Sequence, residues 1–315
     1  MADAYALLWL PFLVSIVLVA IHAYLGLHVL TRNIVFVDLA LAQIAALGAT
    51  VAFMLGHPVN SAGSYGYSLL FTLGAAVLLA STRNWSARVP QEALIGVIYV
   101  VAAAAAFLLV DRAPQGTEHI KQVLTGNILT TGINELAWVV PVYAIIGFAL
   151  WTARKRLERT GSGWAGWAWD FFFYACFGIV VTSSVALAGV LLVFSFLIIP
   201  ASVGMLYADG ARRLWIAWAL GVTASLAGLI ASYAWDLPTG STMVCTFGVA
   251  LAIAGLLRPL ANRDRRTQAG RAIRGAFAVL LAASGAWLAV APRADQPLVD
   301  SFEYAVPAAR RLYLT

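Results

Sequence analysis

Long apolar runs, separated by short polar stretches, occupy most of this chain. A helix needs about 20 apolar residues to cross a hydrocarbon layer of about 30 Å, and its backbone groups must bond within the helix. We identify candidate membrane-spanning helices at 5–29, 34–56, 64–82, 92–111, 134–153, 171–186, 187–206, 213–233, 240–257 and 275–292. The stretch 171–206 is almost continuously apolar and shows little sign of a boundary. The pattern therefore predicts an all-α polytopic integral membrane protein, a bundle of about eight to ten transmembrane helices.

The composition excludes a soluble globular domain. Hydrophobic residues make up 62% of the 315 residues and charged residues only 11%, whereas soluble domains carry about 25% charged residues. The sequence has no G-x-x-x-x-G-K-[ST] motif, so it does not predict ATP binding through a P-loop. We expect a protein that is not itself an enzyme and that would need a separate ATPase for any ATP-driven function.

The basic residues are distributed unequally between the two sides of the predicted bundle. When the loops are placed alternately, only Arg112, Lys121, Arg293, Arg310 and Arg311 of the 20 lysines and arginines fall on the second side. The positive-inside rule then assigns the first side to the cytoplasm and the N-terminus to the outside. The net charge of +6 therefore reports membrane orientation, and it gives no reason to expect a nucleic-acid partner.

The stretch 189–240 contains the most informative arrangement of polar residues. An apolar run passes through Pro200 and ends in the charged patch Asp209–Arg213. A second apolar run follows and stops at Trp235–Gly240, which reads WDLPTG. This pattern predicts two membrane helices joined by a tight cationic loop, with an acid at the far end. Such a loop on the cytoplasmic side suits docking against a soluble partner.

Several segments carry a family resemblance. Residues 189–204 read GVLLVFSFLIIPASVG, residues 208–213 read ADGARR, and residues 236–244 read DLPTGSTMV. Upstream, residues 92–109 read EALIGVIYVVAAAAAFLL and residues 123–130 read VLTGNILT. In this order the segments resemble the permease subunit of metal-ion ABC importers, the zinc, manganese and iron family, over most of residues 10–257.

The resemblance implies a function and a set of partners. It implies a homodimeric permease in the bacterial cytoplasmic (inner) membrane, surrounded by lipid, that moves a divalent transition metal by alternating access, with zinc or manganese expected first. An ABC ATPase subunit would supply the power, and an extracytoplasmic metal-binding protein would deliver the ion. No permanently bound cofactor is expected, because the metal is the transported substrate.

The resemblance also implies roles for particular residues. Asp38, Gln43, Asp236 and Thr239 become candidates for the transport path, with Asp38 and Asp236 as the metal ligands. The ATPase coupling loop would consist of Leu206, Tyr207, Asp209, Gly210, Arg212 and Arg213. Pro200, Gly204, Pro238 and Gly240 are expected to form hinges or turns, and Thr239 is also a candidate helix cap.

One departure from the family pattern concerns the metal path. Family members carry a G-D-A-L-S-H-A element early in the second span, whereas Val37–Ile44 here reads VDLALAQI, with Gln43 in the place of the histidine. Glutamine keeps a carbonyl oxygen but lacks the imidazole nitrogen that suits zinc. The five residues between Asp38 and Gln43 correspond to about 500° of helical rotation, so these side chains are not expected to share a helix face.

The four histidines form no H-x-x-x-H or H-x-H pair. They are His22, His28, His57 and His119. We interpret each as structural or solvated rather than as a metal ligand, so the sequence predicts no fixed all-histidine zinc site. Loose binding is compatible with transport, because tight binding would slow release of the ion.

Two other functions remain open from the sequence. A secondary transporter could use Asp38, Glu92 or Glu135 as a proton relay and would need no ATPase. A membrane scaffold could have kept the permease fold without the ion route. For the domain organisation we expect a transmembrane domain at 1–257, a basic cytoplasmic linker at 258–274, and an additional transmembrane helix with a polar tail at 275–315.

Overall fold

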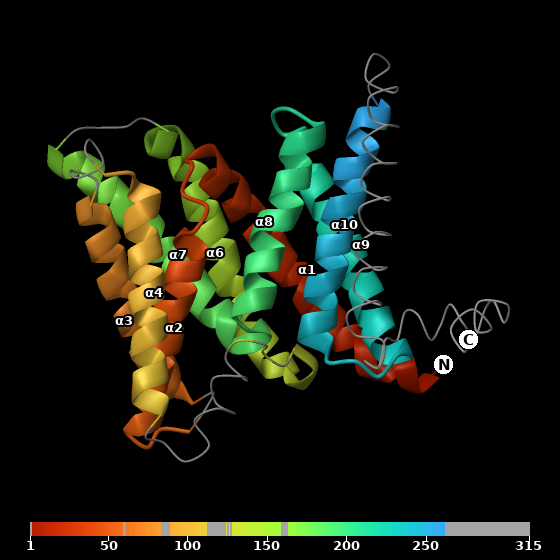
Figure 1. The fold of residues 1–315 in the computed structure, drawn as a ribbon, viewed down its shortest axis with the longest axis horizontal. Coiled ribbons are helices and arrows are strands. Elements are labelled where there is room, and N and C mark those ends of the chain that lie inside the picture. Colours follow the sequence, from red (N-terminus) through yellow and green to blue (C-terminus); the bar gives the residue numbers. More distant parts are fainter. Residues whose placement is uncertain are drawn as a thin grey trace, which may run out of the picture. The chain divides into compact units, whose positions relative to one another are not determined.

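The computed structural model describes residues 2–58, 61–82, 89–111, 124, 126, 128–158 and 163–261. The helices in this part of the chain are α1 (Ala2–Thr31), α2 (Val37–Met54), α3 (Ala62–Ser81), α4 (Gln91–Val110), the short 3₁₀ helix η2 (Ile128–Thr130), α6 (Ile133–Glu158), α7 (Gly163–Ala188), α8 (Val190–Tyr207), α9 (Arg212–Ala234) and α10 (Thr239–Ala261) (Figure 1).

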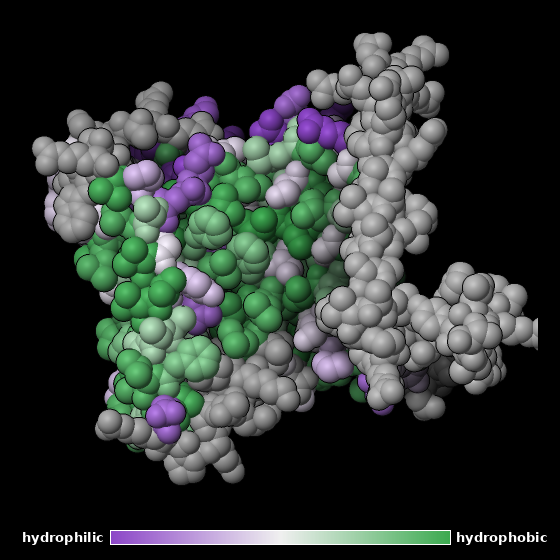
Figure 2. Space-filling model, in the orientation of Figure 1, coloured by the Kyte–Doolittle hydropathy of each residue, from purple (hydrophilic) through white to green (hydrophobic). Residues whose placement is uncertain are grey.

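The nine α-helices of the described ranges are all long and apolar enough to cross a membrane. No strand occurs in these ranges. In Figure 2 hydrophobic residues cover the middle of the visible surface, and hydrophilic residues gather toward its upper edge. The predicted all-α membrane bundle is therefore confirmed. The expected span at 275–292 lies outside the described residues.

The weakly marked boundary in the stretch 171–206 is a sharp break at Gly189. This residue has φ +78°, a left-handed conformation that glycine adopts without a steric penalty. α7 ends at Ala188 and α8 begins at Val190, and the two helices run in opposite directions (Figure 1). Gly126 lies against this break, because an added Cβ would be only 2.2 Å from the Ala188 carbonyl carbon. A single glycine thus separates two spans.

The helices α6 and α7 extend beyond the predicted limits of 153 and 171 because polar residues at their ends have partners. The Arg32 guanidinium after α1 donates a hydrogen bond of 2.7 Å to the Leu157 carbonyl and forms a 3.8 Å ion pair with Asp170. Its central carbon also lies 4.4 Å from the centre of the Phe173 ring. These contacts bring the end of α1, the end of α6 and the start of α7 to one end of the bundle, which we call the basic end.

Small residues allow α1, α8 and α9 to approach closely. A Cβ on Gly26 would lie 2.1 Å from the Leu197 carbonyl oxygen, and one on Gly221 would lie 2.4 Å from a Val19 methyl group. Lipid tails are as apolar as leucine, so close packing of this kind replaces the hydrophobic drive between helices. This packing holds together the part of the bundle that carries the 208–211 turn.

Gly204→Ala is expected to destabilise the folded bundle by about 1–3 kcal/mol, because the added Cβ would lie 2.3 Å from the Arg213 backbone oxygen. We expect a melting temperature several degrees lower in a thermal-shift assay of the detergent-solubilised protein. The matched control is Gly74→Ala in α3, where no atom lies within 4 Å of the added Cβ. Equal melting temperatures for the two variants would contradict this account of the α8–α9 contact.

The chain divides into two compact units, Met1–Gly255 and Leu256–Thr315. The first unit contains α1 to α9 and most of α10. The structure describes the second unit only as far as Ala261, where the helical residues 258–261 form the end of α10. The rest of the expected basic linker and the expected C-terminal span lie outside the described residues.

Candidate functional site

Asp38 is an isolated carboxylate inside the bundle. It lies in the first turn of α2 and has no solvent-exposed surface. Neither carboxylate oxygen has a hydrogen-bond partner among the described residues. A charged side chain in a membrane helix costs about 2.5–3.5 kcal/mol on insertion scales, and the positive pole of a helix N-terminus, about half a charge, offsets only part of it. The position therefore suits a carboxylate that receives a cation.

Gln43 is also buried, with 7% of its surface exposed. α2 continues without interruption from Val37 to Met54, so the five-residue spacing keeps Gln43 and Asp38 on different sides of the helix. The structure therefore does not join these two residues into one pair of ligands. Each side chain could offer an oxygen atom to a cation, but on a different side of α2.

The structure adds a buried polar cluster that our sequence analysis missed. His22 on α1 has no exposed surface, and its ring lies edge-on to Tyr143 on α6, with 6.5 Å between ring centres. The Tyr143 hydroxyl forms hydrogen bonds with Ser183 and Ser184 on α7. Serines and a tyrosine scattered over apolar helices carry no spacing signal, because they meet only when the three helices pack. We call these four residues the His22 cluster.

Asp236 lies at the opposite end of the bundle from the basic end. It is exposed in the turn between α9 and α10 and has φ +50°. α9 packs against α1 in the reverse direction: the Trp218 indole donates to the Ala20 carbonyl, and Gly221 lies against Val19 (Figure 1). The end of α9 therefore lies near the start of α1, far from Arg32. Asp38 and Asp236 do not share one metal site.

Thr239 stabilises the turn between α9 and α10. Its hydroxyl is 2.8 Å from the Ser232 hydroxyl, and Ser232 also donates to the Leu237 carbonyl at 2.8 Å. The side chain thus points back to α9, and Gly240, expected in the turn, lies within α10. Pro238 directly precedes α10 and accepts the bond from the Thr242 amide, as an initiating turn residue would.

The expected coupling loop is a four-residue turn, 208–211, between two long helices. Leu206 and Tyr207 belong to the last turn of α8, where the Tyr207 hydroxyl donates to the Ala254 carbonyl. Gly210 has φ +60°, which the tight turn requires. No separate helix forms in the turn, so a soluble partner would contact the turn itself and the helix ends.

Charged residues around the turn have different surroundings. Asp209 exposes 97% of its side chain and pairs with Arg213 at 2.8 Å, and the Arg213 Nε–H also donates to the Ala208 carbonyl. Arg213 therefore stabilises the turn through contacts with two of its residues, Asp209 and Ala208. Arg212 is exposed at the first residue of α9. The structure assigns a shaping role to Arg213 and leaves Arg212 on the surface.

Pro200 and Gly204, which we expected in hinges or turns, do not form a turn. α8 continues through both residues to Tyr207. A proline is tolerated within a membrane helix when neighbouring groups compensate for its missing N–H, and Gly204 has the packing role against α9 described above.

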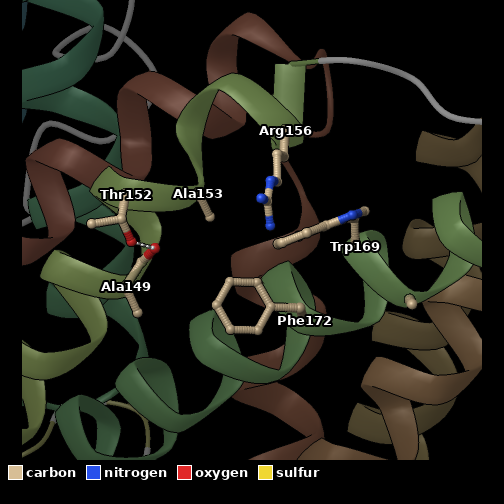
Figure 3. A pocket seen from close by; sticks show the side chains of 7 residues that line it. Ala149, Thr152, Ala153, Arg156, Trp169 and Phe172 are labelled. Carbon is tan, nitrogen blue, oxygen red and sulfur yellow. Dashed lines mark hydrogen bonds between the residues drawn. The ribbon is translucent and has the colours of Figure 1, made fainter.

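A groove of about 610 Å³ lies between α6 and α7 at the basic end (Figure 3). The Arg156 guanidinium points into it, 5.5 Å from the centre of the Trp169 ring, and Phe172 and Ala149 are also among the residues that line it. Arginine and tryptophan together are typical of residues that anchor a helix at the membrane interface. The groove contains neither Asp38 nor any residue of the His22 cluster.

The described residues contain no group of three or more His, Cys, Asp or Glu side chains that could hold a metal ion. The buried polar groups occur instead as separate positions, which is the arrangement expected for transient binding along a path.

Residues 4–258 match the ABC-3 family, described as the ABC 3 transport family. Three relatives with related names are similar over most of their lengths. The "Probable iron transport system membrane protein" of Haemophilus influenzae is 23% identical over 77% of this chain and 90% of its own. The "Manganese transport system membrane protein MntC" of Listeria monocytogenes is 21% identical over 81% and 92%, and MntB of Synechocystis is 23% identical over 80% and 82%.

The fold is similar to that of a solved structure. "PsaBC from Streptococcus pneumoniae in complex with Fab" contains a chain with a TM-score of 0.65 and 20% identity, and the match covers 80% of this chain and 93% of that one. The arrangement of the helices is therefore similar to that of this solved chain.

Proposed function

This chain belongs to the ABC 3 transport family, and we propose that it is the permease subunit of an ABC importer for a divalent transition metal, manganese or iron before zinc. The expected resemblance to that family is confirmed, as is the multi-pass bacterial membrane protein. The observation that supports the proposed function most is the buried Asp38 carboxylate, which has no hydrogen-bond partner among the described residues. The relatives named above transport manganese or iron, and carboxylate and carbonyl oxygens suit manganese.

The proposed mechanism is alternating access. An extracytoplasmic binding protein would deliver the ion to the end of the bundle that carries Asp236. The ion would pass between the helices and leave near Asp38, which lies in the first turn after the α1–α2 connection at the basic end. A partner ATPase dimer would transmit closure through the 208–211 turn of each permease copy. Oxygen ligands that bind weakly would release the ion quickly.

The proton-relay alternative is less well supported. Glu92 lies at the basic end, where its carboxylate accepts a 3.3 Å hydrogen bond from the Val35 amide, so it caps the α1–α2 connection. Glu135 is exposed in the first turn of α6, at the opposite end of that helix from Leu157. Only Asp38 of the three acids is fully buried, and Glu92 and Glu135 lie at opposite ends of the bundle.

The proposed function is tested by affinity purification of the native complex in mild detergent, with mass spectrometry of the associated proteins. We expect a P-loop ATPase and a metal-binding lipoprotein or periplasmic protein to copurify. Cells with the intact gene should also take up radioactive Mn²⁺ or Fe²⁺ faster than cells without it. Recovery of the chain alone, with transport in vesicles that responds to a pH gradient, would support the secondary transporter instead.

A further inference from the structure

The hydrogen bond of the His22 ring determines which of its nitrogens can bind a cation. Nδ1 lies 2.8 Å from the Leu18 carbonyl oxygen, one helical turn earlier on α1. A carbonyl oxygen only accepts, so Nδ1 carries the hydrogen, and in the neutral ring Nε2 keeps a bare lone pair. Nε2 is buried and has no hydrogen-bond partner among the described residues. A backbone contact of this kind orients metal-binding histidines in general.

His22 lies beside the Tyr143 ring, and the two serine hydroxyls that contact the Tyr143 hydroxyl donate their hydrogens to backbone carbonyls. Ser183 donates to the Ile179 and Val180 carbonyls at 2.9 Å, and Ser184 donates to the Val180 carbonyl at 2.7 Å. The two serine oxygens can therefore accept from Tyr143, whose single hydrogen satisfies one of them at a time. The cluster thus holds more acceptor lone pairs than hydrogens. This surplus excludes an anion as its ligand and favours a cation.

We propose that the His22 Nε2 atom is a ligand for the transported divalent metal ion, which passes between α1, α6 and α7. The proposal rests on the permease function proposed above. It supplies from α1 the imidazole that α2 lacks at Gln43. Imidazole nitrogen suits iron and zinc, and neutral or anionic oxygen ligands suit manganese.

His22 and Asp38 lie at different depths in the membrane. His22 is nine residues before the end of α1 at Thr31, which corresponds to about 14 Å along the helix axis. Asp38 follows only seven residues after Thr31, in the first turn of α2. The ion would therefore meet the His22 cluster in the interior of the bundle before it reaches the carboxylate at the basic end.

The test is Mn²⁺ binding to the purified full-length chain in lipid nanodiscs, followed by electron spin echo spectroscopy. A bound imidazole nitrogen modulates the Mn²⁺ echo. We expect this ¹⁴N modulation in the wild type and its loss in His22→Phe, which keeps a ring of similar size. The matched control is His28→Phe on the same helix, whose ring Nδ1 also contacts a carbonyl one turn earlier, that of Tyr24. The affinity tag must contain no histidine.

A second variant keeps the test decisive if His22→Phe does not fold. The triple substitution His28→Phe, His57→Phe and His119→Phe leaves His22 as the only histidine of the four. The ¹⁴N modulation must persist in this variant. Its absence there or in the wild type, or its persistence in His22→Phe, would overturn the proposal.

Uptake measurements separate this proposal from the function on which it rests. In cells with the native partners, His22→Phe is expected to lower Mn²⁺ or Fe²⁺ uptake by about tenfold or more, and His28→Phe is expected to leave it nearly unchanged. Wild-type uptake without any ¹⁴N modulation would refute the role of His22 and leave the permease function standing. Wild-type cells that show no metal uptake at all would refute the permease function itself.

Discussion

Asp38→Asn is expected to lower metal uptake by about tenfold or more while the protein remains folded. Asparagine has nearly the same shape as aspartate and keeps one carbonyl oxygen, but it cannot carry a negative charge. Asp38 is fully buried and neither oxygen has a partner among the described residues. Removing the charge therefore removes an attraction for the cation without breaking any hydrogen bond that the structure shows. Radioactive Mn²⁺ uptake and a thermal-shift assay measure the two effects separately.

The matched control for this prediction is Asp111→Asn, the same chemical change at the exposed end of α4. We expect this control to transport normally. Full uptake by Asp38→Asn would show that Asp38 is a neutral acid that only packs between helices. In that case the membrane scaffold, or an ion route that avoids α2, would become the better interpretation.

Arg212→Glu is expected to uncouple ATP hydrolysis from transport, again with the bundle intact. Arg212 is exposed at the start of α9, so reversing its charge changes the surface offered to an ATPase and little inside the bundle. We expect a loss of metal uptake of about thirtyfold or more, because removing one partner of a charge pair buried at an interface costs about 2 kcal/mol or more. ATPase activity of the purified complex should no longer respond to the metal-loaded binding protein.

Two comparisons make this prediction specific. Lys155→Glu reverses an exposed charge near the end of α6, away from the 208–211 turn, and is expected to keep normal coupling. Arg213→Glu is expected to lower stability as well, because it places a second acid beside Asp209 and removes the bond to the Ala208 carbonyl. Metal-dependent ATPase activity that is unchanged in the double variant Arg212→Glu with Arg213→Glu would count against the coupling assignment.

Polar residues near the ends of membrane helices explain where the predicted helix limits were wrong. The sequence predicts that the fifth span ends before Arg154 and that the sixth begins after Asp170, because charges normally end a span. In the structure Asp170 pairs with Arg32 from a distant segment, and Arg32 also binds the Leu157 carbonyl. A helix can continue beyond its apolar run when the charged residue at its end has a partner. The sequence pattern contains no information about that partner.

In the candidate site, too, some features could be predicted from the local sequence and others depend on contacts between distant helices. Asp38 could be found from the sequence because a lone acid in an apolar helix is expensive, and the turn at 208–211 because a short charged patch interrupts two apolar runs. The His22 cluster could not be found, since its members come from α1, α6 and α7. No turn forms at Pro200 or Gly204, because α8 is continuous from Val190 to Tyr207, and the expected hinge there stays a prediction.

The sequence by itself determined the class of the protein, the approximate positions of its membrane helices and its family. These follow from hydrophobicity over about 20 residues and from short motifs, which are local properties of the chain. Only the tertiary structure decided which buried polar groups have no partner among the described residues and which glycines allow two helices to approach closely. It also decided which arginine stabilises the 208–211 turn. Those properties depend on contacts between helices far apart in the sequence, so they exist only once the bundle has packed.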